Sequence, residues 1–154
     1  IIWNIKAVTP EGKNLNVKAF DTEGNEFDVK AIQDAKQHSF MSIMAFIEGY
    51  EVHCRVMDSE NEYAPVQAIG ANGTIYDIKA VTESGEKLDV GGVSRSGKIV
   101  HVKAINANGD LYGVKAFAPD GKLNDVKGIK IFDRKVELKS LGHPVYAHLK
   151  AIRQ

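Results

Sequence analysis

Apolar and polar residues alternate along most of the chain, in units of about twelve residues that each end in a turn. The clearest unit, residues 15–20, reads Leu-Asn-Val-Lys-Ala-Phe and is followed by Asp-Thr-Glu-Gly. A repeat of fixed length indicates that one structural unit is built many times over. The lysine of Val-Lys-Ala marks the register, and its position is held by Lys6, Lys18, Lys30, Met44, Arg55, Gln67, Lys79, Gly91, Lys103, Lys115, Lys127, Lys139 and Lys150.

Within each unit the alternation has a period of two, which is typical of a strand with one buried face. Val17 and Ala19 then face the core, while Asn16 and Lys18 face solvent. Residues 39–47 also resemble a short buried helix, but the repeat continues through them. We therefore expect a strand there as well.

Each unit has a turn position six residues after the register mark. Asn61 and Asp133 fill it in two units, and glycine fills it in seven. Glycine tolerates a left-handed backbone best, followed by Asn and Asp. The pattern predicts hairpins with three-residue loops whose last residue is left-handed. The glycines are Gly12, Gly24, Gly73, Gly85, Gly97, Gly109 and Gly121.

This loop length fixes the expected pairing across each hairpin. A loop over residues 22–24 sets Val17 opposite Val29 and Lys18 opposite Asp28, so that one face stays apolar throughout. It also sets Asn16 opposite Lys30. A loop over residues 107–109 does the same for the later hairpin, with Lys103 opposite Gly113 and Val102 opposite Val114.

Together the units predict a single all-β domain over residues 1–154, an antiparallel meander of about 12–13 short strands. The residue types of the repeat also recur every fourth unit, which favours three four-stranded units with pseudo-threefold symmetry, like a prism or trefoil. Equal units build up little of the stagger that a closed barrel requires. A flattened barrel or sandwich, or a small propeller, is the alternative.

The composition excludes several classes of protein. Lys+Arg and Asp+Glu both number 20, so the formal net charge is +0 and no nucleic-acid partner is expected. No apolar run is long enough to span a membrane. The single cysteine, Cys54, holds the Val position of its unit, where we expect a buried and unreactive thiol. The common catalytic motifs are missing, so we expect no enzyme, no cofactor and no metal.

The candidate binding residues share one position, two residues before the register mark. Histidine holds it in three units and aspartate in three others. Equivalent polar sites on the outer face are one interpretation, and ordinary polar residues of a solvated face beside lysine are the other. These candidates are His53, His101, His148, Asp28, Asp77 and Asp125. The aromatic residues Trp3, Phe27, Tyr76 and Tyr112 share an apolar position instead, which predicts core packing.

The units Phe-Asp-Val-Lys-Ala-Ile (27–32) and Tyr-Asp-Ile-Lys-Ala-Val (76–81) resemble the tandem repeats of uncharacterised secreted or lipid-anchored bacterial proteins. The resemblance implies a cell-envelope or extracellular setting. The chain starts inside a strand without Met, and we expect that a signal segment has been removed. The expected function is a non-catalytic structural or protein-interaction module; the alternative is a small glycan-binding domain. The expected partner is a protein or glycan at the cell surface.

Overall fold

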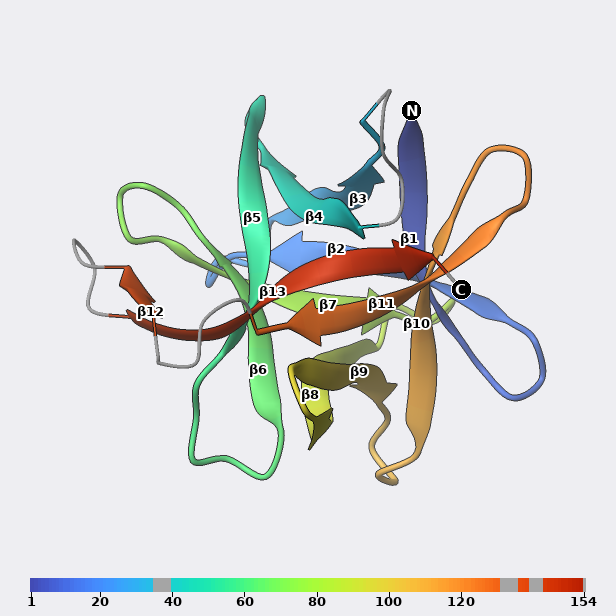
Figure 1. Cartoon of the computed structure of the whole chain (residues 1–154). Helices are drawn as coiled ribbons and strands as arrows, with labels where there is room; N and C mark the ends of the chain where they lie inside the picture. Colours follow the sequence, from blue (N-terminus) through green and yellow to red (C-terminus); the bar gives the residue numbers. More distant parts are fainter. Residues whose placement is uncertain (35–39, 131–135, 139–142, 154) are drawn as a thin grey trace.

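A computed structural model describes residues 1–34, 40–130, 136–138 and 143–153 of the chain. The described part is all β, without a helix, and its strands pair antiparallel (Figure 1). The strands are β1 (Ile2–Val8), β2 (Asn14–Phe20), β3 (Glu26–Ile32), β4 (Phe40–Ile47), β5 (Tyr50–Met57), β6 (Ala64–Ile69), β7 (Ile75–Val81), β8 (Lys87–Ser96), β9 (Ile99–Ile105), β10 (Leu111–Phe117), β11 (Leu123–Ile129), β12 (Val136–Leu138) and β13 (His143–Arg153). The predicted antiparallel meander is confirmed, including the strand β4 within the helix-like stretch.

The inner face of each strand carries the Val and Ala positions of the repeat. The Val position is buried, as at Val17 and Val29. Trp3 is buried, and Phe27, Tyr76 and Tyr112 pack partly buried against the same core, as predicted. The Ala position is the tightest, because nine alanines there have no exposed surface: Ala7, Ala19, Ala31, Ala45, Ala68, Ala80, Ala104, Ala116 and Ala151.

The hairpins with three-residue loops pair over only three residues next to the turn, and then their strands separate, whereas β8 and β9 stay paired along their length. In the hairpin of β2 and β3, Lys18 lies opposite Asp28, as predicted. The predicted pair of Val17 with Val29 is wrong, because Val17 lies opposite Ala80 of β7 and Val29 opposite Ala45 of β4. Besides each other, β2 pairs with β1 and β7, and β3 pairs with β1 and β4.

The same divergence corrects two other predicted pairs. Asn16 lies opposite Lys6, not Lys30, because β1 pairs with the start of β2. In the later hairpin, Lys103 lies opposite Gly113 as predicted. Val102 and Val114 do not face each other, because β9 has turned towards β8 and β10 towards β1.

The strands meet in four groups of three, in which every strand pairs with the other two. We call each group a vertex: β1–β2–β3, β4–β5–β13, β6–β7–β8 and β9–β10–β11. One pairing joins each vertex to each of the others, namely β1–β10, β2–β7, β3–β4, β5–β6, β8–β9 and β11–β13. The pairings thus have the connectivity of a tetrahedron, with four corners and six edges. The predicted grouping into three four-stranded units is wrong, because strands associate in threes.

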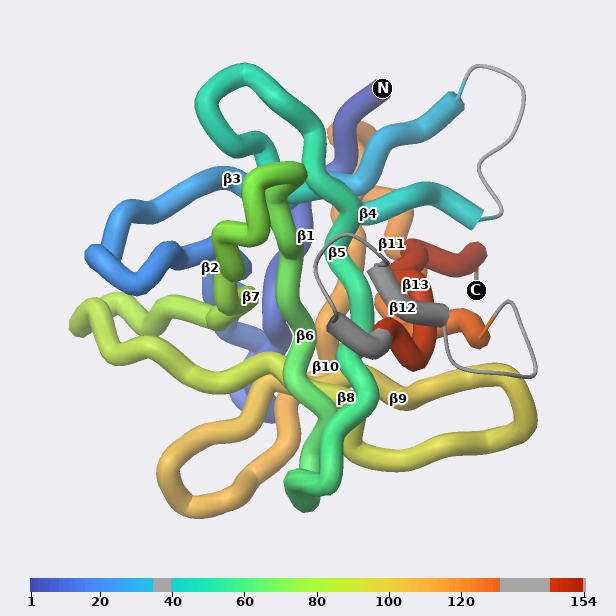
Figure 2. Tube along the Cα trace, turned by 90° about the vertical axis from the view of Figure 1, so that its left-hand side faces the viewer, coloured from blue at the N-terminus to red at the C-terminus, as the bar shows by residue number. Residues whose placement is uncertain are grey.

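This connectivity closes the sheet around one core. Each strand other than β12 pairs with at least three others, so no strand of this set lies at a free edge of the sheet over its whole length. Figure 1 shows hairpin loops projecting in several directions from a common centre, and Figure 2 shows β5 and β6 side by side. The C-terminal β13 completes the vertex that β4 and β5 begin, and its Lys150 contacts Ser42 of β4, 108 residues earlier in the chain.

The turn glycines behave as predicted, and all seven have a positive φ. At the loop before β10, the amide of Asn106 donates to the carbonyl of Asp110 (3.0 Å) and that of Gly109 to the carbonyl of Asn106 (3.0 Å). Gly97 differs, because Ser96 pairs with Ile99 across a two-residue turn.

The prediction of a left-handed backbone at the Asn and Asp turn positions is not confirmed at Asn61. Glu48 is the one non-glycine residue with positive φ in the described part of the chain, so Asn61 is not left-handed. Asp133 lies outside the described residues, as does Lys139.

Candidate functional site

The outer face of each vertex carries a ring of six residues, which we call its polar ring. The ring consists of the register-mark residue of each strand and the residue two positions before it. At the β1–β2–β3 vertex the ring is cyclic: the Lys6 ammonium donates to Asn16 (2.5 Å), Lys18 to Asp28 (2.6 Å) and Lys30 to Asn4 (2.6 Å). Each lysine therefore has an oxygen acceptor on the next strand.

The β9–β10–β11 vertex keeps most of this arrangement. Lys115 forms an ion pair with Asp125, and the ammonium of Lys127 lies 3.2 Å from Nδ1 of His101. The third pair is reduced to Lys103 opposite Gly113, which has no side chain.

All six residues predicted from the sequence lie on polar rings, but not as equivalent sites. His53 and His148 share the β4–β5–β13 vertex, while His101 lies with Asp125 on another. Asp28 and Asp77 belong to the remaining two vertices. The recurrence every fourth unit therefore does not correspond to a structural period.

The β6–β7–β8 vertex has lost one pair of its ring. Gln67 donates to Asp77 (2.8 Å), and Lys79 forms an ion pair with Asp89. At the third pair Gly91 replaces lysine and Pro65 replaces the polar residue opposite. The third hydrogen-bonded pair of the ring is therefore missing. A cavity of about 420 Å³ lies over this vertex.

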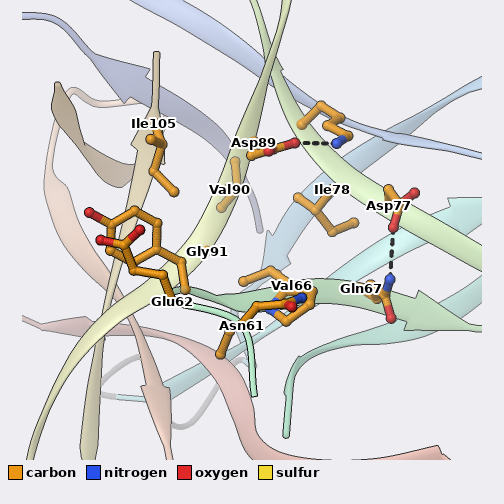
Figure 3. Close-up of a pocket in the computed structure, with 14 residues that line it drawn as sticks. Asn61, Glu62, Val66, Gln67, Asp77, Ile78, Asp89, Val90, Gly91 and Ile105 are labelled. Carbon is orange, nitrogen blue, oxygen red and sulfur yellow. Dashed lines mark hydrogen bonds and ion pairs between the residues drawn. The ribbon is translucent and has the colours of Figure 1, made fainter. Parts of the chain in front are cut away.

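Polar and apolar side chains both line the cavity (Figure 3). Figure 3 shows Glu62 and Ile105 on one side and the Asp77–Gln67 pair on the other, with Val90 between them. The polar groups that line it are the carboxylates of Glu62, Asp77 and Asp89, the amides of Asn61 and Gln67, and the ammonium of Lys79. Tyr63 adds an aromatic ring.

Sequence reasoning identified Asp77 but missed most of this cavity. Gly91 carried a signal, because it breaks the lysine register in an otherwise clear unit. A Cβ built on Gly91 would lie 3.1 Å from the carbonyl oxygen of Ala64 and 3.4 Å from Cβ of Tyr63. The segment before β6 therefore passes directly over the position where other units place a lysine stem.

The β4–β5–β13 vertex is different again, because cations dominate its ring. His148 lies opposite Arg55, and the Lys150 ammonium donates to Oγ of Ser42 (2.9 Å). Burial lowers the pKa values of His53, His148, Arg55 and Lys150. The positive charges of Arg55 and Lys150 lower the pKa values of the two histidines further.

Two other features bear on chemistry. Cys54 is buried as predicted, and burial raises the pKa of its thiol to about 12. Within the described residues, no group of three or more His, Cys, Asp or Glu side chains could hold a metal ion. The part of the chain that the structure describes also has no helix long and apolar enough to cross a membrane.

The chain belongs to a family of unknown function, DUF7486, whose sequence profile matches residues 1–152. The match extends from the first residue to the last residue but one of β13, so it includes all four vertices. No curated protein matches the chain, and no solved structure does.

Proposed function

We propose that this member of the DUF7486 family is a non-catalytic binding module that takes a glycan at the β6–β7–β8 vertex. The observation that carries the proposal is the cavity over the incomplete polar ring of this vertex, which both hydrogen-bonding and apolar side chains line. Ligand sites of small molecules typically combine a concave, largely apolar surface with a few placed polar groups.

The chemistry of the lining matches a sugar ring. Hydroxyl groups donate hydrogen bonds to carboxylates and accept them from ammonium and amide groups. Asp77 is held by Gln67, and Asp89 by Lys79, so both carboxylates are oriented before any ligand arrives. The C–H face of a sugar would pack on Val90, Ile105 or Tyr63. Because the carboxylates already have partners, we assign them to hydrogen bonding and not to proton transfer.

The chain offers a matched pair of variants for the test. Asp89→Asn alters a carboxylate that lines the cavity, whereas Asp28→Asn alters the same ring position, with the same kind of lysine contact, at the β1–β2–β3 vertex. A ligand is first identified on a glycan array and its affinity is then measured by titration calorimetry. We expect Asp89→Asn to weaken binding by about tenfold, the effect of one hydrogen bond to a charged group, and Asp28→Asn to leave it nearly unchanged.

Two results would contradict the proposal. One is an array on which the folded protein binds no glycan. The other is equal weakening by both variants, since that result would move the binding site away from the cavity. Turnover of any compound in a panel of glycan, peptide and ester substrates would contradict the non-catalytic assignment.

A protein-interaction module is the second candidate. Large apolar side chains are exposed near the start of β1 and of β4: Ile1 is 72%, Ile2 53% and Phe40 54% exposed. Exposed apolar groups of this kind favour contact with a protein partner. Ile2→Ser combined with Phe40→Ser should abolish capture of such a partner in a pull-down, while Asp89→Asn should not affect it.

The resemblance of the repeat units to secreted or lipid-anchored bacterial proteins supports a cell-envelope or extracellular setting for this module. Fractionation of native cells with an antibody against the chain tests that setting. Recovery in the cytoplasmic fraction alone would contradict it.

A further inference from the structure

The polar ring of the β4–β5–β13 vertex contains no carboxylate. Its six residues are Ser42, Met44, His53, Arg55, His148 and Lys150. The other three vertices each place at least one aspartate in the ring, and Asp28, Asp89 and Asp125 accept a lysine ammonium there. Four basic side chains therefore share the outer face of this vertex. No carboxylate in its ring balances their charge, unlike in the rings of the other three vertices.

The register brings these side chains close together. His148 lies directly opposite Arg55, and Lys150 lies two residues further along β13, on the same face of the strand. Directly opposite side chains on antiparallel strands have Cβ atoms about 5 Å apart. One small anion can therefore contact groups from β5 and β13 simultaneously.

Their existing contacts leave donors to spare. The Lys150 ammonium has three protons and donates one to Ser42. Nε of Arg55 is buried and has no hydrogen-bond partner within the described residues. Buried polar atoms are nearly always paired, so an unpaired guanidinium nitrogen beside other cations indicates that an acceptor belongs there.

Neighbouring strands add little negative charge. The charged or titratable groups around this vertex are Lys30 opposite Met44, Lys127 opposite Lys150, Glu51 on β5, and Glu48, which lines the adjoining groove with Glu51. Glu51 raises the pKa of His53, but less than burial, Arg55 and Lys150 lower it. The surroundings therefore leave the vertex positive.

A groove of about 610 Å³ runs beside the same ring. His53 and Arg55 line it, together with Tyr50 and Tyr76. An anionic group on the ring could thus carry an organic substituent that rests against these aromatic side chains.

We infer that the β4–β5–β13 vertex binds a small oxyanion of the sulfate or phosphate class, held by His53, Arg55, His148 and Lys150. Planar guanidinium and ammonium groups are the usual partners of such anions. Protonation of either histidine adds a positive charge, so binding strengthens as the pH falls. The site is separate from the glycan cavity and does not depend on it.

Inorganic sulfate is the probe, because its charge is constant between pH 5.5 and pH 8. Backbone amide shifts are followed by NMR during titration with sodium sulfate, against sodium chloride at matched ionic strength. We expect saturable shifts confined to β4, β5 and β13, and an affinity at pH 5.5 at least about fivefold higher than at pH 8, the factor for one added charge contact in water.

The variants replace the lysine at the same position of the repeat in two different polar rings. Lys150→Met should weaken sulfate binding by at least about fivefold, while Lys6→Met, in the ring with Asn16 and Asp28, should not change it. Methionine already occupies this position at Met44, so the change suits the fold. His148→Gln is a second test, since it should remove much of the pH dependence of the sulfate affinity.

The inference is overturned if chloride reproduces the shifts, if affinity is the same at both pH values, or if Lys6→Met weakens binding as much as Lys150→Met. A final arm compares inorganic sulfate with phenyl sulfate. Tighter binding of the ester assigns the site and its groove to an aromatic ester, and tighter binding of sulfate assigns the ring to the free ion.

Discussion

Adding one methyl group at Gly128 should destabilise the protein, because the core has no room for it. Gly128 holds the Ala position of β11, and a Cβ there would lie 2.8 Å from Cγ2 of Val56 and 3.0 Å from Cβ of Val100. Val56 is the valine that occupies the Ala position of β5, and it is fully buried. The larger residue in one unit is thus accommodated by a glycine in another.

The magnitude follows from two opposing effects. Overpacking by one methyl group costs about 1–3 kcal/mol. Replacing glycine lowers the entropy of the unfolded chain and recovers about 0.4–1 kcal/mol. Gly128→Ala should therefore lower the free energy of unfolding by roughly 1–2 kcal/mol, as measured by urea denaturation.

Val56→Ala tests the origin of this cost. Alone it removes buried methyl groups and should cost about 2 kcal/mol. Combined with Gly128→Ala it restores alanine to both positions, so the double variant should be more stable than the sum of the two changes predicts, by about 1 kcal/mol or more.

Gly113 supplies the control for the glycine change. A Cβ built on Gly113 would meet only the side chains of Lys115 (3.7 Å) and Lys103 (4.0 Å), which is ordinary contact. Gly113→Ala should therefore be neutral or slightly stabilising. Parent-like stability of Gly128→Ala, or strict additivity with Val56→Ala, would refute the packing argument.

Three further predictions concern a turn, a thiol and a pair of histidines. Gly109→Val should lower the free energy of unfolding by roughly 1–3 kcal/mol, because a β-branched residue is strained at φ 84°; an unchanged urea midpoint would contradict the loop assignment. Cys54, with a thiol pKa of about 12, should resist alkylation by iodoacetamide at pH 8 until urea unfolds the chain, and rapid labelling of the folded protein would contradict its burial. Folding lowers the pKa values of His53 and His148, so the unfolded chain binds more protons and stability should fall as the pH drops below about 6.5. Urea midpoints at pH 7.5 and pH 5.5 measure this dependence, which a double variant with Gln at both positions should reduce.

The candidate sites were only partly predictable. Asp77, His53 and His148 were identified because they share one position of the repeat. Gly91 and Pro65, which line the cavity, occupy two of the positions where the repeat fails, but only the pairing of β6 with β8 brings them together. The spacing between His53, His101 and His148 suggested equivalent sites, yet the fold places the first and last on one vertex and His101 on another.

The amino-acid sequence by itself determined the local features of this protein: where strands run, which face is buried and where the chain turns. These follow from short-range physics, since alternation sets the faces of a strand and only glycine adopts the left-handed turn at no cost. The register within two or three residues of each loop, such as Lys18 with Asp28, follows from loop length alone.

The tertiary structure alone decided which strands meet beyond those few residues. Nearly identical units offer each strand several apolar partners of equal quality, so nothing near Val17 in the sequence favours Ala80 over Val29. That choice depends on closing every edge around one core. The same closure decides that β13 joins β4 and β5, and so places Lys150 beside Ser42 and His148 opposite Arg55 in a ring without an acid.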